Sequence, residues 1–310
     1  MFAMKFTCTK ENIHHVLGLT SALTGRQTHL PILSHVLIEA RESRVDVVAT
    51  NLEVAVRATV RAKVEIQGTF TVPAKTFTDY IGLLSEEQVN IWLDGQELVV
   101  ESGSSHTRVK GTAAEEFPVM PEIDEQHVYT IDANKLRDGL TETVTATAKN
   151  EIRPELSGVY AGFFTDRYKG LVLAATDSYR LAETQIPVLQ GKDALSVIIP
   201  ARTVYEMVRL IGLAKADAGD EPVRLFVSDN QIAMRYNAFE MTSRLIDGKY
   251  PDYVQIVPTK FKTSATIPTD VLANKIKAAA LFTTTGVNAV SFDLNAAEHT
   301  VAVSSANTQT

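Results

Sequence analysis

The sequence is almost free of cysteine, which limits how the protein can be stabilised. It has 310 residues and one cysteine, Cys8, so no disulfide can form within the chain. This usage is typical of a reducing compartment such as the cytoplasm. Cys8 lies in an alternating run with Phe6, which predicts a small core side chain rather than a reactive thiol.

Long apolar runs are also missing. No stretch is apolar over the length needed to cross a bilayer, and the N-terminus does not have the basic and then apolar layout of a signal peptide. We therefore expect a soluble, cytoplasmic protein without a membrane partner.

Motifs that would indicate catalysis or a cofactor are not found. The seven histidines are scattered, and no P-loop, nucleotide fingerprint or nucleophile elbow is present. Asp177 lies close to Arg180, but a carboxylate in this context is typical of a turn. The sequence predicts a protein that is not an enzyme and that has no cofactor and no metal site.

Positive charge is in deficit. The formal net charge is −7, which argues against a surface that binds nucleic acid all over but does not exclude a local basic face. Acidic residues concentrate in the segments 85–87, 114–116, 122–125 and 217–221, as is usual for solvated loops.

What the sequence does contain is an internal repeat. Residues 72–84 (VPAKTFTDYIGLL) match residues 199–211 (IPARTVYEMVRLI), and residues 48–52 and 33–36 are echoed in the same order by 174–178 and 156–159. The separations are nearly constant, between 123 and 127 residues, which indicates a duplicated domain. Function is then expected to depend on how the copies assemble.

A third copy begins near the C-terminus. Residues 5–19, 129–143 and 265–279 share a short β-favouring run followed by apolar positions at helical spacing. We therefore predict three domains, at 1–125, 126–260 and 261–310. Because one repeat spans roughly 125 residues, we expect a natural protein that is longer, or one that has lost most of its third domain.

Each complete copy reads as two similar half-units, in which a helix is followed by strands. The helices are predicted to start near Asn12, Lys75, Asn134 and Arg202. A fold with all its helices on one face of antiparallel sheets belongs to the α+β class.

The predicted helices carry basic residues on their outer faces. In the helix after Pro200, Val204 and Ile211 fall on one stripe, and Arg202 and Arg209 lie almost opposite it. By the same angles, Lys75 and Lys277 point outward in the first and third copies, the latter opposite Leu272, Ile276 and Ala279. Amphipathic helices often carry such residues without any function. Their recurrence in every copy, with Asp79 and Glu206 nearby, favours weak contact with phosphates.

Several short motifs occur together in an order that resembles a known family. They are ATDSYRLA (175–182), LSGV (156–159), IPAR (199–202), GKYPDY (248–253), LPILS (30–34), ATNLE (49–53), VPAK (72–75) and EFP (116–118). Each motif alone is weak. Their joint order and spacing resemble the bacterial DNA polymerase III β subunits, the replicative sliding clamps, over essentially the whole chain.

The resemblance implies a ring around duplex DNA. In this family two head-to-tail subunits of three domains each close the ring, with antiparallel sheets outside and helices lining a central channel. It implies a homodimer that acts as a processivity factor and contacts DNA through Arg26, Lys75, Arg202 and Arg209.

The resemblance also implies a pocket for partner peptides from the polymerase III α subunit, the clamp loader and other proteins with a clamp-binding motif. The matching wall consists of Leu156, Thr176, Ser178, Tyr179, Arg180, Leu181, Pro251 and Ile256. Taken without the family, these residues would read as core and turn. Ser178-Tyr179 replaces the Gly-His of many clamps, and Gln255 stands where some members place an arginine, so the pocket shape is expected to differ.

One alternative from another class stays open. A repeat scaffold could bind proteins without encircling DNA. Such a scaffold has no need for outward Arg and Lys residues on the helices of every copy, which is the feature that separates the two hypotheses.

Overall fold

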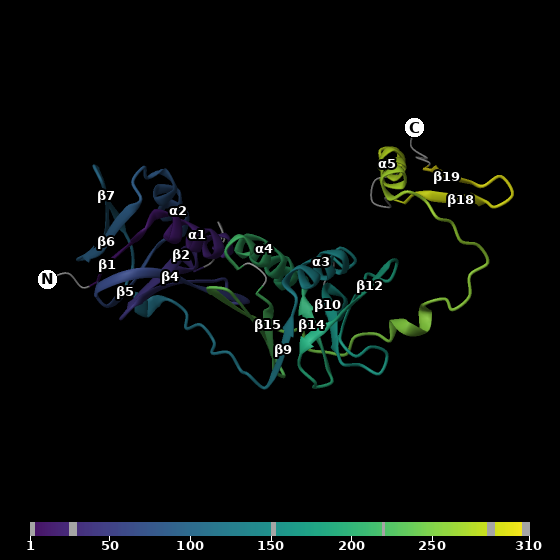
Figure 1. The fold of residues 1–310 in the computed structure, drawn as a ribbon, viewed down its shortest axis with the longest axis horizontal. Helices are drawn as coiled ribbons and strands as arrows, with labels where there is room; N and C mark the ends of the chain where they lie inside the picture. Colours follow the sequence, from purple (N-terminus) through teal and green to yellow (C-terminus); the bar gives the residue numbers. More distant parts are fainter. Residues whose placement is uncertain (1–3, 25–29, 150–152, 219–220, 284–288, 306–310) are drawn as a thin grey trace. The chain divides into compact units, whose positions relative to one another are not determined.

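The computed structural model describes residues 4–24, 30–149, 153–218, 221–283 and 289–305. It divides into two compact units, Met1–Tyr250 and Pro251–Thr310, which are considered separately below (Figure 1).

The first unit contains two modules of similar element order. The first module comprises β1 (Lys5–Thr9), α1 (Lys10–Thr20), β2 (His35–Arg41), β3 (Arg44–Thr50), β4 (Val54–Ile66), β5 (Gly68–Pro73), α2 (Ala74–Leu83), β6 (Gln88–Asp94), β7 (Glu97–Ser102) and β8 (Ser105–Lys110). The second module comprises β9 (His127–Ile131), α3 (Ala133–Val144), β10 (Gly158–Phe163), β11 (Leu171–Thr176), β12 (Leu181–Ile186), β13 (Val188–Gln190), β14 (Leu195–Pro200), α4 (Ala201–Ala218), β15 (Val223–Val227), β16 (Gln231–Tyr236) and β17 (Phe239–Arg244). The predicted half-units, each beginning with a helix, are confirmed.

In the part of the chain that the structure describes, all strand pairs are antiparallel, and one sheet joins the two modules. Thirteen strands form a sheet in which β17 of the second module pairs with β4 of the first, with Met241 opposite Val56. A second sheet has the order β12-β11-β10-β14. The α+β class with antiparallel sheets is therefore confirmed, and backbone hydrogen bonds tie the modules together.

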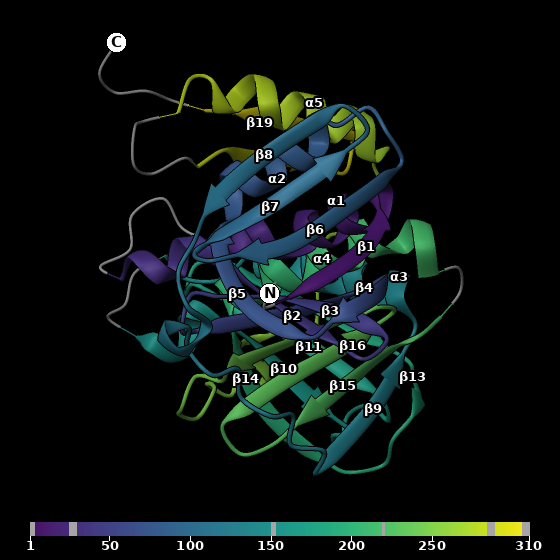
Figure 2. The ribbon, with the colours of Figure 1, turned by 90° about the vertical axis from the view of Figure 1, so that its left-hand side faces the viewer.

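Within the described residues of the first unit, the α-helices α1 to α4 form one row across both modules. Helix α1 contacts α2 and α4, and α4 contacts α3, so the order in space is α2-α1-α4-α3. In Figure 1 these helices follow one another along the same side of the strands, and Figure 2 shows the sheets from the end of the first module. This helical row, α2-α1-α4-α3, carries most of the residues expected to contact DNA.

The core lies between the helical row and the sheets. Phe6, Leu17 and Phe77 of the first module and Tyr129 and Phe163 of the second are fully buried. Each such side chain contributes about 1.5–3 kcal/mol by leaving water. Cys8 is also buried, and burial raises the pKa of its thiol to about 12, which confirms that it is a core residue.

Local hydrogen bonds fix where two helices of the row, α1 and α3, begin. The Thr9 side chain accepts a hydrogen bond from the Asn12 amide at 3.3 Å, and the Asp132 side chain accepts one from the Lys135 amide at 2.9 Å. Side chains of this kind satisfy amide groups that the first helical turn leaves unpaired. The predicted starts near Asn12 and Asn134 are therefore confirmed with their physical cause.

The second unit contains a short 3₁₀ segment (Tyr253–Ile256), helix α5 (Thr269–Ala280) and a hairpin of β18 (Ser291–Asn295) and β19 (Thr300–Ser304). On α5, Leu272, Ile276 and Ala279 are half-buried and Lys277 is exposed, as predicted. Residues 265–268 form no strand, although their counterparts in the other copies are β1 and β9. Within the described residues, no helix is long and apolar enough to cross a membrane.

Candidate nucleic-acid interface and partner-binding turn

Two of the predicted DNA-contacting residues are exposed on the helical row. The side chain of Lys75 on α2 is 68% exposed and pairs with Asp79, and that of Arg202 on α4 is 66% exposed and pairs with Glu53 at 3.2 Å. Exposed pairs of this kind are weak, about 0–1 kcal/mol. Both cations therefore remain available to an anion that competes with their carboxylates.

Arg209 is half-buried, with its side chain 26% exposed, so the prediction that it projects outward beside Arg202 is wrong, while its contact with DNA stays a prediction. Its guanidinium donates hydrogen bonds to the carbonyl oxygens of Gly18 at 3.1 Å and Leu19 at 2.6 Å, and it also pairs with Glu206. Helix α1 ends at Thr20, and the last carbonyls of a helix have no partner within it and attract a cation. The helical wheel of α4 alone could not show that α1 packs against this face.

Replacing Arg209 should therefore reduce stability more than replacing Arg202. An Arg209→Ala variant leaves two half-buried carbonyls without their charged donor, which is expected to cost about 1.5–3 kcal/mol of unfolding free energy. The matched Arg202→Ala variant removes only an exposed pair and should cost about 0.5 kcal/mol or less. Urea denaturation measures both, and equal losses would show that Arg209 does not join the two modules.

Two other basic residues concern DNA contact by the helical row. Arg26 lies outside the described residues. Lys135 on α3 is exposed, and no ion pair is found for it among the described residues. The sequence analysis missed Lys135, although its position in the first turn of an amphipathic helix could have indicated it.

The segment Thr176–Arg180 forms a tight turn between β11 and β12. The Thr176 hydroxyl donates to the Arg180 carbonyl at 2.7 Å and accepts from the Ser178 amide at 3.1 Å. The carboxylate of Asp177 accepts from the amides of Tyr179 and Arg180, both at 3.0 Å. Ser178 has a φ of 77°, a left-handed conformation that these local bonds hold.

The first module repeats this turn at residues Thr50–Val54. The Thr50 hydroxyl bonds to the Val54 carbonyl and the Leu52 amide, both at 3.0 Å. The side-chain oxygen of Asn51 accepts from the amides of Glu53 and Val54, at 3.0 and 2.9 Å. The sequence repeat is thus also a repeat of hydrogen bonds, with Asn51 in the place of Asp177.

The charge of Asp177 adds a dependence on pH. Burial acts to raise its pKa, but hydrogen bonds from the amides of Arg180 and Tyr179 and the Arg180 guanidinium together hold the pKa below its usual value. The stability that the carboxylate contributes is therefore present above the unfolded pKa, about 3.9, and is lost as the pH falls through the lower folded pKa.

Two substitutions at Asp177 separate the roles of shape and charge. Asp177→Asn keeps an acceptor for both amides, as Asn51 does in the first module, and should change the unfolding free energy by about 0.5 kcal/mol or less. Asp177→Ala leaves both amides without their acceptor and should cost about 1–2 kcal/mol. Thermal unfolding at pH 7 and pH 3 measures both effects. A loss in the Asn variant as large as in the Ala variant would contradict this account.

The turn and the first residue of β12 offer an exposed surface. Tyr179 is 99% exposed, and Ser178 and Arg180 are also exposed. Along β12, Ala182 and Ile186 face the core and α3, so Leu181 lies on the other face, where it is half-buried. Leu181 is therefore not a core residue.

Leu156 is placed at the same end of the four-stranded sheet. It lies just before β10, and the pairing of Tyr160 with Ala174 and of Thr176 with Leu181 brings the start of β10 next to the turn. Leu156 is 3% exposed, so its side chain offers little surface to a ligand.

The remaining predicted pocket residues belong to the second unit. Pro251 is half-buried there, and Ile256 is 70% exposed. The Gln255 side chain donates to the Asp252 carboxylate at 2.7 Å. That these residues complete one pocket with the turn stays a prediction.

The sequence analysis missed a tyrosine that supports the turn. The Tyr250 hydroxyl accepts a hydrogen bond from the buried Thr176 amide at 3.0 Å, and its ring lies 5.5 Å from that of Tyr160. Burial raises the pKa of Tyr250, so the phenol stays neutral at physiological pH. The GKYPDY motif contains this residue, but only the fold shows its partner.

Among the described residues, no group of three or more His, Cys, Asp and Glu side chains is placed to hold a metal ion. The candidate site consists of a helical row with exposed cations and a turn with exposed side chains beside the half-buried Leu181. Serial α+β modules with paired helices on one side of antiparallel sheets define the DNA-clamp fold class.

Comparisons with known proteins agree with this class. Residues 4–121 match the sequence model of the DNA polymerase III beta subunit N-terminal domain, and residues 130–252 match that of its central domain. A beta sliding clamp of Escherichia coli is 30% identical over 257 residues, 82% of this chain and 68% of that protein. A beta sliding clamp of Synechococcus elongatus is 27% identical over 297 residues, 94% of this chain and 78% of that protein.

The fold comparison gives the same result. The crystal structure of a sliding clamp from Pseudomonas aeruginosa bound to griselimycin superposes with a TM-score of 0.83 at 25% identity, covering 97% of this chain and 83% of that one. The chain belongs to the beta sliding clamp family, the beta subunits of DNA polymerase III.

Proposed function

We propose that this sliding clamp encircles duplex DNA as a head-to-tail dimer and tethers the replicative polymerase, as the processivity factor of bacterial chromosomal replication. The observation that carries the proposal is the helical row α2-α1-α4-α3, which continues across two modules and presents Lys75 and Arg202 as exposed cations.

Weak contacts suit a clamp that must slide. Lys75 and Arg202 are each already paired with a carboxylate, so a phosphate gains little by replacing that partner. Contacts of this kind through water allow the duplex to move, and the closed ring prevents its escape. The net charge of −7 is compatible, because only the helical row needs to be basic.

A dimer needs an open edge on each subunit. Strand β8 (Ser105–Lys110) is the last strand at one end of the 13-stranded sheet. Such an edge has unpaired backbone groups and can pair with a strand of another chain. We infer that ring closure uses this edge, with the copies acting as domains 1–125, 126–260 and 261–310.

The turn Thr176–Arg180 and Leu181 are assigned to partner docking. Short segments of the polymerase α subunit, the clamp loader and other proteins with a clamp-binding motif would insert apolar side chains beside Leu181, and Pro251 and Ile256 are proposed as further residues that contact these segments. Leu156 would support this wall from below, because it is buried. An apolar anchor in a preformed groove gives modest affinity and easy exchange.

Three further properties belong to the same proposal. The clamp would be a non-catalytic subunit of the polymerase holoenzyme. It would act in the cytoplasm. It would contact DNA through Lys135 as well as through Lys75 and Arg202. The alternative of a protein scaffold that does not encircle DNA is not favoured, because the relatives are sliding clamps.

The length of the polymerase product tests the proposal. Primer extension on a primed single-stranded circle, with the replicative polymerase, its clamp loader and a trap for released polymerase, should give products many times longer when this protein is added. Products of unchanged length, with loader and polymerase both active on a known clamp, would contradict the proposal.

A further inference from the structure

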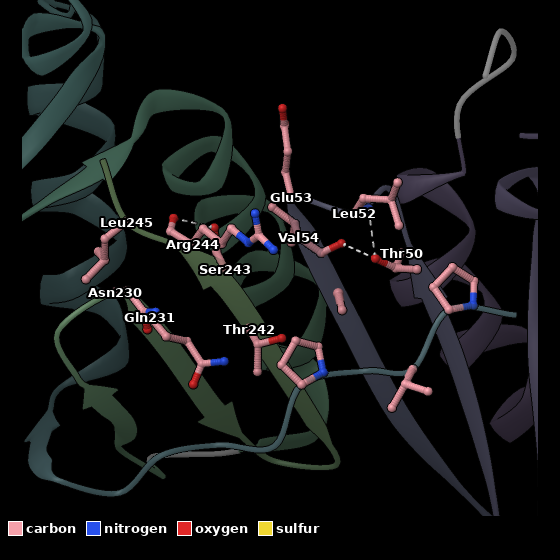
Figure 3. A pocket seen from close by; sticks show the side chains of 14 residues that line it. Thr50, Leu52, Glu53, Val54, Asn230, Gln231, Thr242, Ser243, Arg244 and Leu245 are labelled. Carbon is pink, nitrogen blue, oxygen red and sulfur yellow. Dashed lines mark hydrogen bonds between the residues drawn. The ribbon is translucent and has the colours of Figure 1, made fainter. Parts of the chain in front are cut away.

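A cavity of about 820 Å³ lies between the first and second modules, away from the turn assigned to partner docking (Figure 3). It is lined by the turn that joins β3 to β4, by β17 and the start of β16, and by residues 118–121. Its volume lies in the range of ligand pockets, about 300–1,000 Å³.

The cavity contains the counterpart of the partner-docking turn. Thr50 and Leu52 of the first module's turn line it, and these residues correspond to Thr176 and Ser178 of the second module through the same hydrogen bonds. The same turn therefore occurs in both modules, with different residues around it. In the first module, the wall facing the turn is β17 of the second module.

Leu52 has a backbone conformation that is unusual for leucine. Its φ is 75°, a left-handed conformation that favours glycine and asparagine, and its side chain is 53% exposed. A strained backbone that presents an apolar side chain beside a cavity is a feature typical of binding sites. Figure 3 shows Leu52 on one side of the cavity, with Leu245 and Gln231 on the other.

The lining combines three chemistries. Val54, Leu245 and Pro118 are apolar, and Asn230 and Gln231 are amides that can bond to peptide groups. The third chemistry is positive charge. Arg244 is exposed at the cavity, and within the described part of the chain no carboxylate pairs with its guanidinium. The other charged residue of the lining, Glu53, is already paired with Arg202.

We propose that this cavity binds a short extended peptide of a partner protein, in which an aliphatic side chain lies next to a carboxylate. The aliphatic side chain would pack against Leu52, which is 53% exposed, and the carboxylate would pair with Arg244. The proposal rests on the proposed function, since it extends to the first module the docking role assigned to the turn of the second. Because Leu52 and Glu53 replace Ser178 and Tyr179, the two sites would select different peptides.

A Leu181→Asp chain isolates the proposed cavity site, because this change disables only the second-module turn. The probe is the capped peptide acetyl-Asp-Leu-Val-Leu-amide with a fluorescein label, and its binding is measured by fluorescence anisotropy. We expect the Leu181→Asp chain to bind the probe. Adding Arg244→Ala or Leu52→Asp should weaken that binding at least tenfold, and a probe with Asn for Asp should bind about as weakly as the Arg244→Ala variant binds the original.

The chain offers matched controls. Leu52→Asp is compatible with the left-handed backbone, since Asp tolerates it better than Leu. Arg224→Ala removes an exposed arginine of β15 outside the lining and should leave probe binding unchanged.

Three results would overturn the proposal. One is the absence of binding to the Leu181→Asp chain at any probe concentration up to 1 mM, about the weakest affinity of practical use. Another is binding that survives both cavity substitutions. The third is self-association, seen by sedimentation, that both substitutions abolish while no probe binds, because the occupant would then be a second copy. Failure of the proposed function would be seen separately, as primer-extension products whose length the unchanged chain does not increase, and failure of the docking role of Leu181 as stimulation that persists in the Leu181→Asp chain.

Discussion

A Leu181→Asp variant is expected to bind partner peptides at least about a hundredfold more weakly and to lose polymerase stimulation, while it still folds. Leu181 begins β12 on the face away from α3 and is half-buried. A carboxylate there removes an apolar contact and must lose water when a peptide covers it, which together exceed about 2.7 kcal/mol. Peptide titration by anisotropy and primer extension measure the two effects.

The same strand supplies the control. Gln185 lies four residues after Leu181 on β12. It is on the same face of the strand and is exposed. A Gln185→Asp variant adds the same charge and should keep affinity within about twofold, since an exposed charge has a small effect. If both variants lose binding equally, the negative charge of the strand matters rather than the apolar contact, and the assignment of Leu181 is wrong.

A Lys75→Ala, Arg202→Ala double variant is expected to bind a short linear duplex about tenfold or more weakly at low salt. Both side chains are exposed on the helical row. If each contacts one phosphate, the slope of log affinity against log salt concentration should fall in magnitude by about two. Sequence preference should not change, because phosphate contacts do not read bases.

A cation outside the helical row is the control for this prediction. Lys169 is exposed between β10 and β11, and its ammonium donates to the Thr165 carbonyl at 3.2 Å. Lys169→Ala removes one positive charge, the same as either single substitution of the pair, but should leave the salt slope unchanged, whereas Lys75→Ala or Arg202→Ala alone should lower its magnitude by about one. Equal effects of the two changes would mean that net charge, rather than the helical row, determines DNA binding.

The fold followed from the sequence where the pattern is local. The repeat of VPAK and IPAR at the starts of α2 and α4 predicted two copies. Helices α1 and α3 begin just after Thr9 and Asp132, whose side chains accept hydrogen bonds from amides three residues further on. Apolar spacing on α5 placed Leu272 on its least exposed face. Such features depend on neighbours along the chain, which the sequence contains.

The candidate site was predictable only in part, because several of its properties depend on distant residues. Arg209 looked exposed on its own helix, but its guanidinium donates to the carbonyl oxygens of Gly18 and Leu19, which are 191 and 190 residues away. Thr176 was predicted from its motif, whereas its partner Tyr250 lies 74 residues further on. The family resemblance identified the turn, and the contacts between modules decide how each residue acts.

Retention on circular DNA tests most directly the central claim that topology, not affinity, holds the clamp. The protein is loaded on a nicked circular plasmid by a clamp loader and separated from free protein by gel filtration, before and after a single restriction cut. We predict that it stays on the circle, leaves the linear DNA, and is retained again when both linear ends carry bulky blocks. Equal retention on the circle and on unblocked linear DNA would contradict the account.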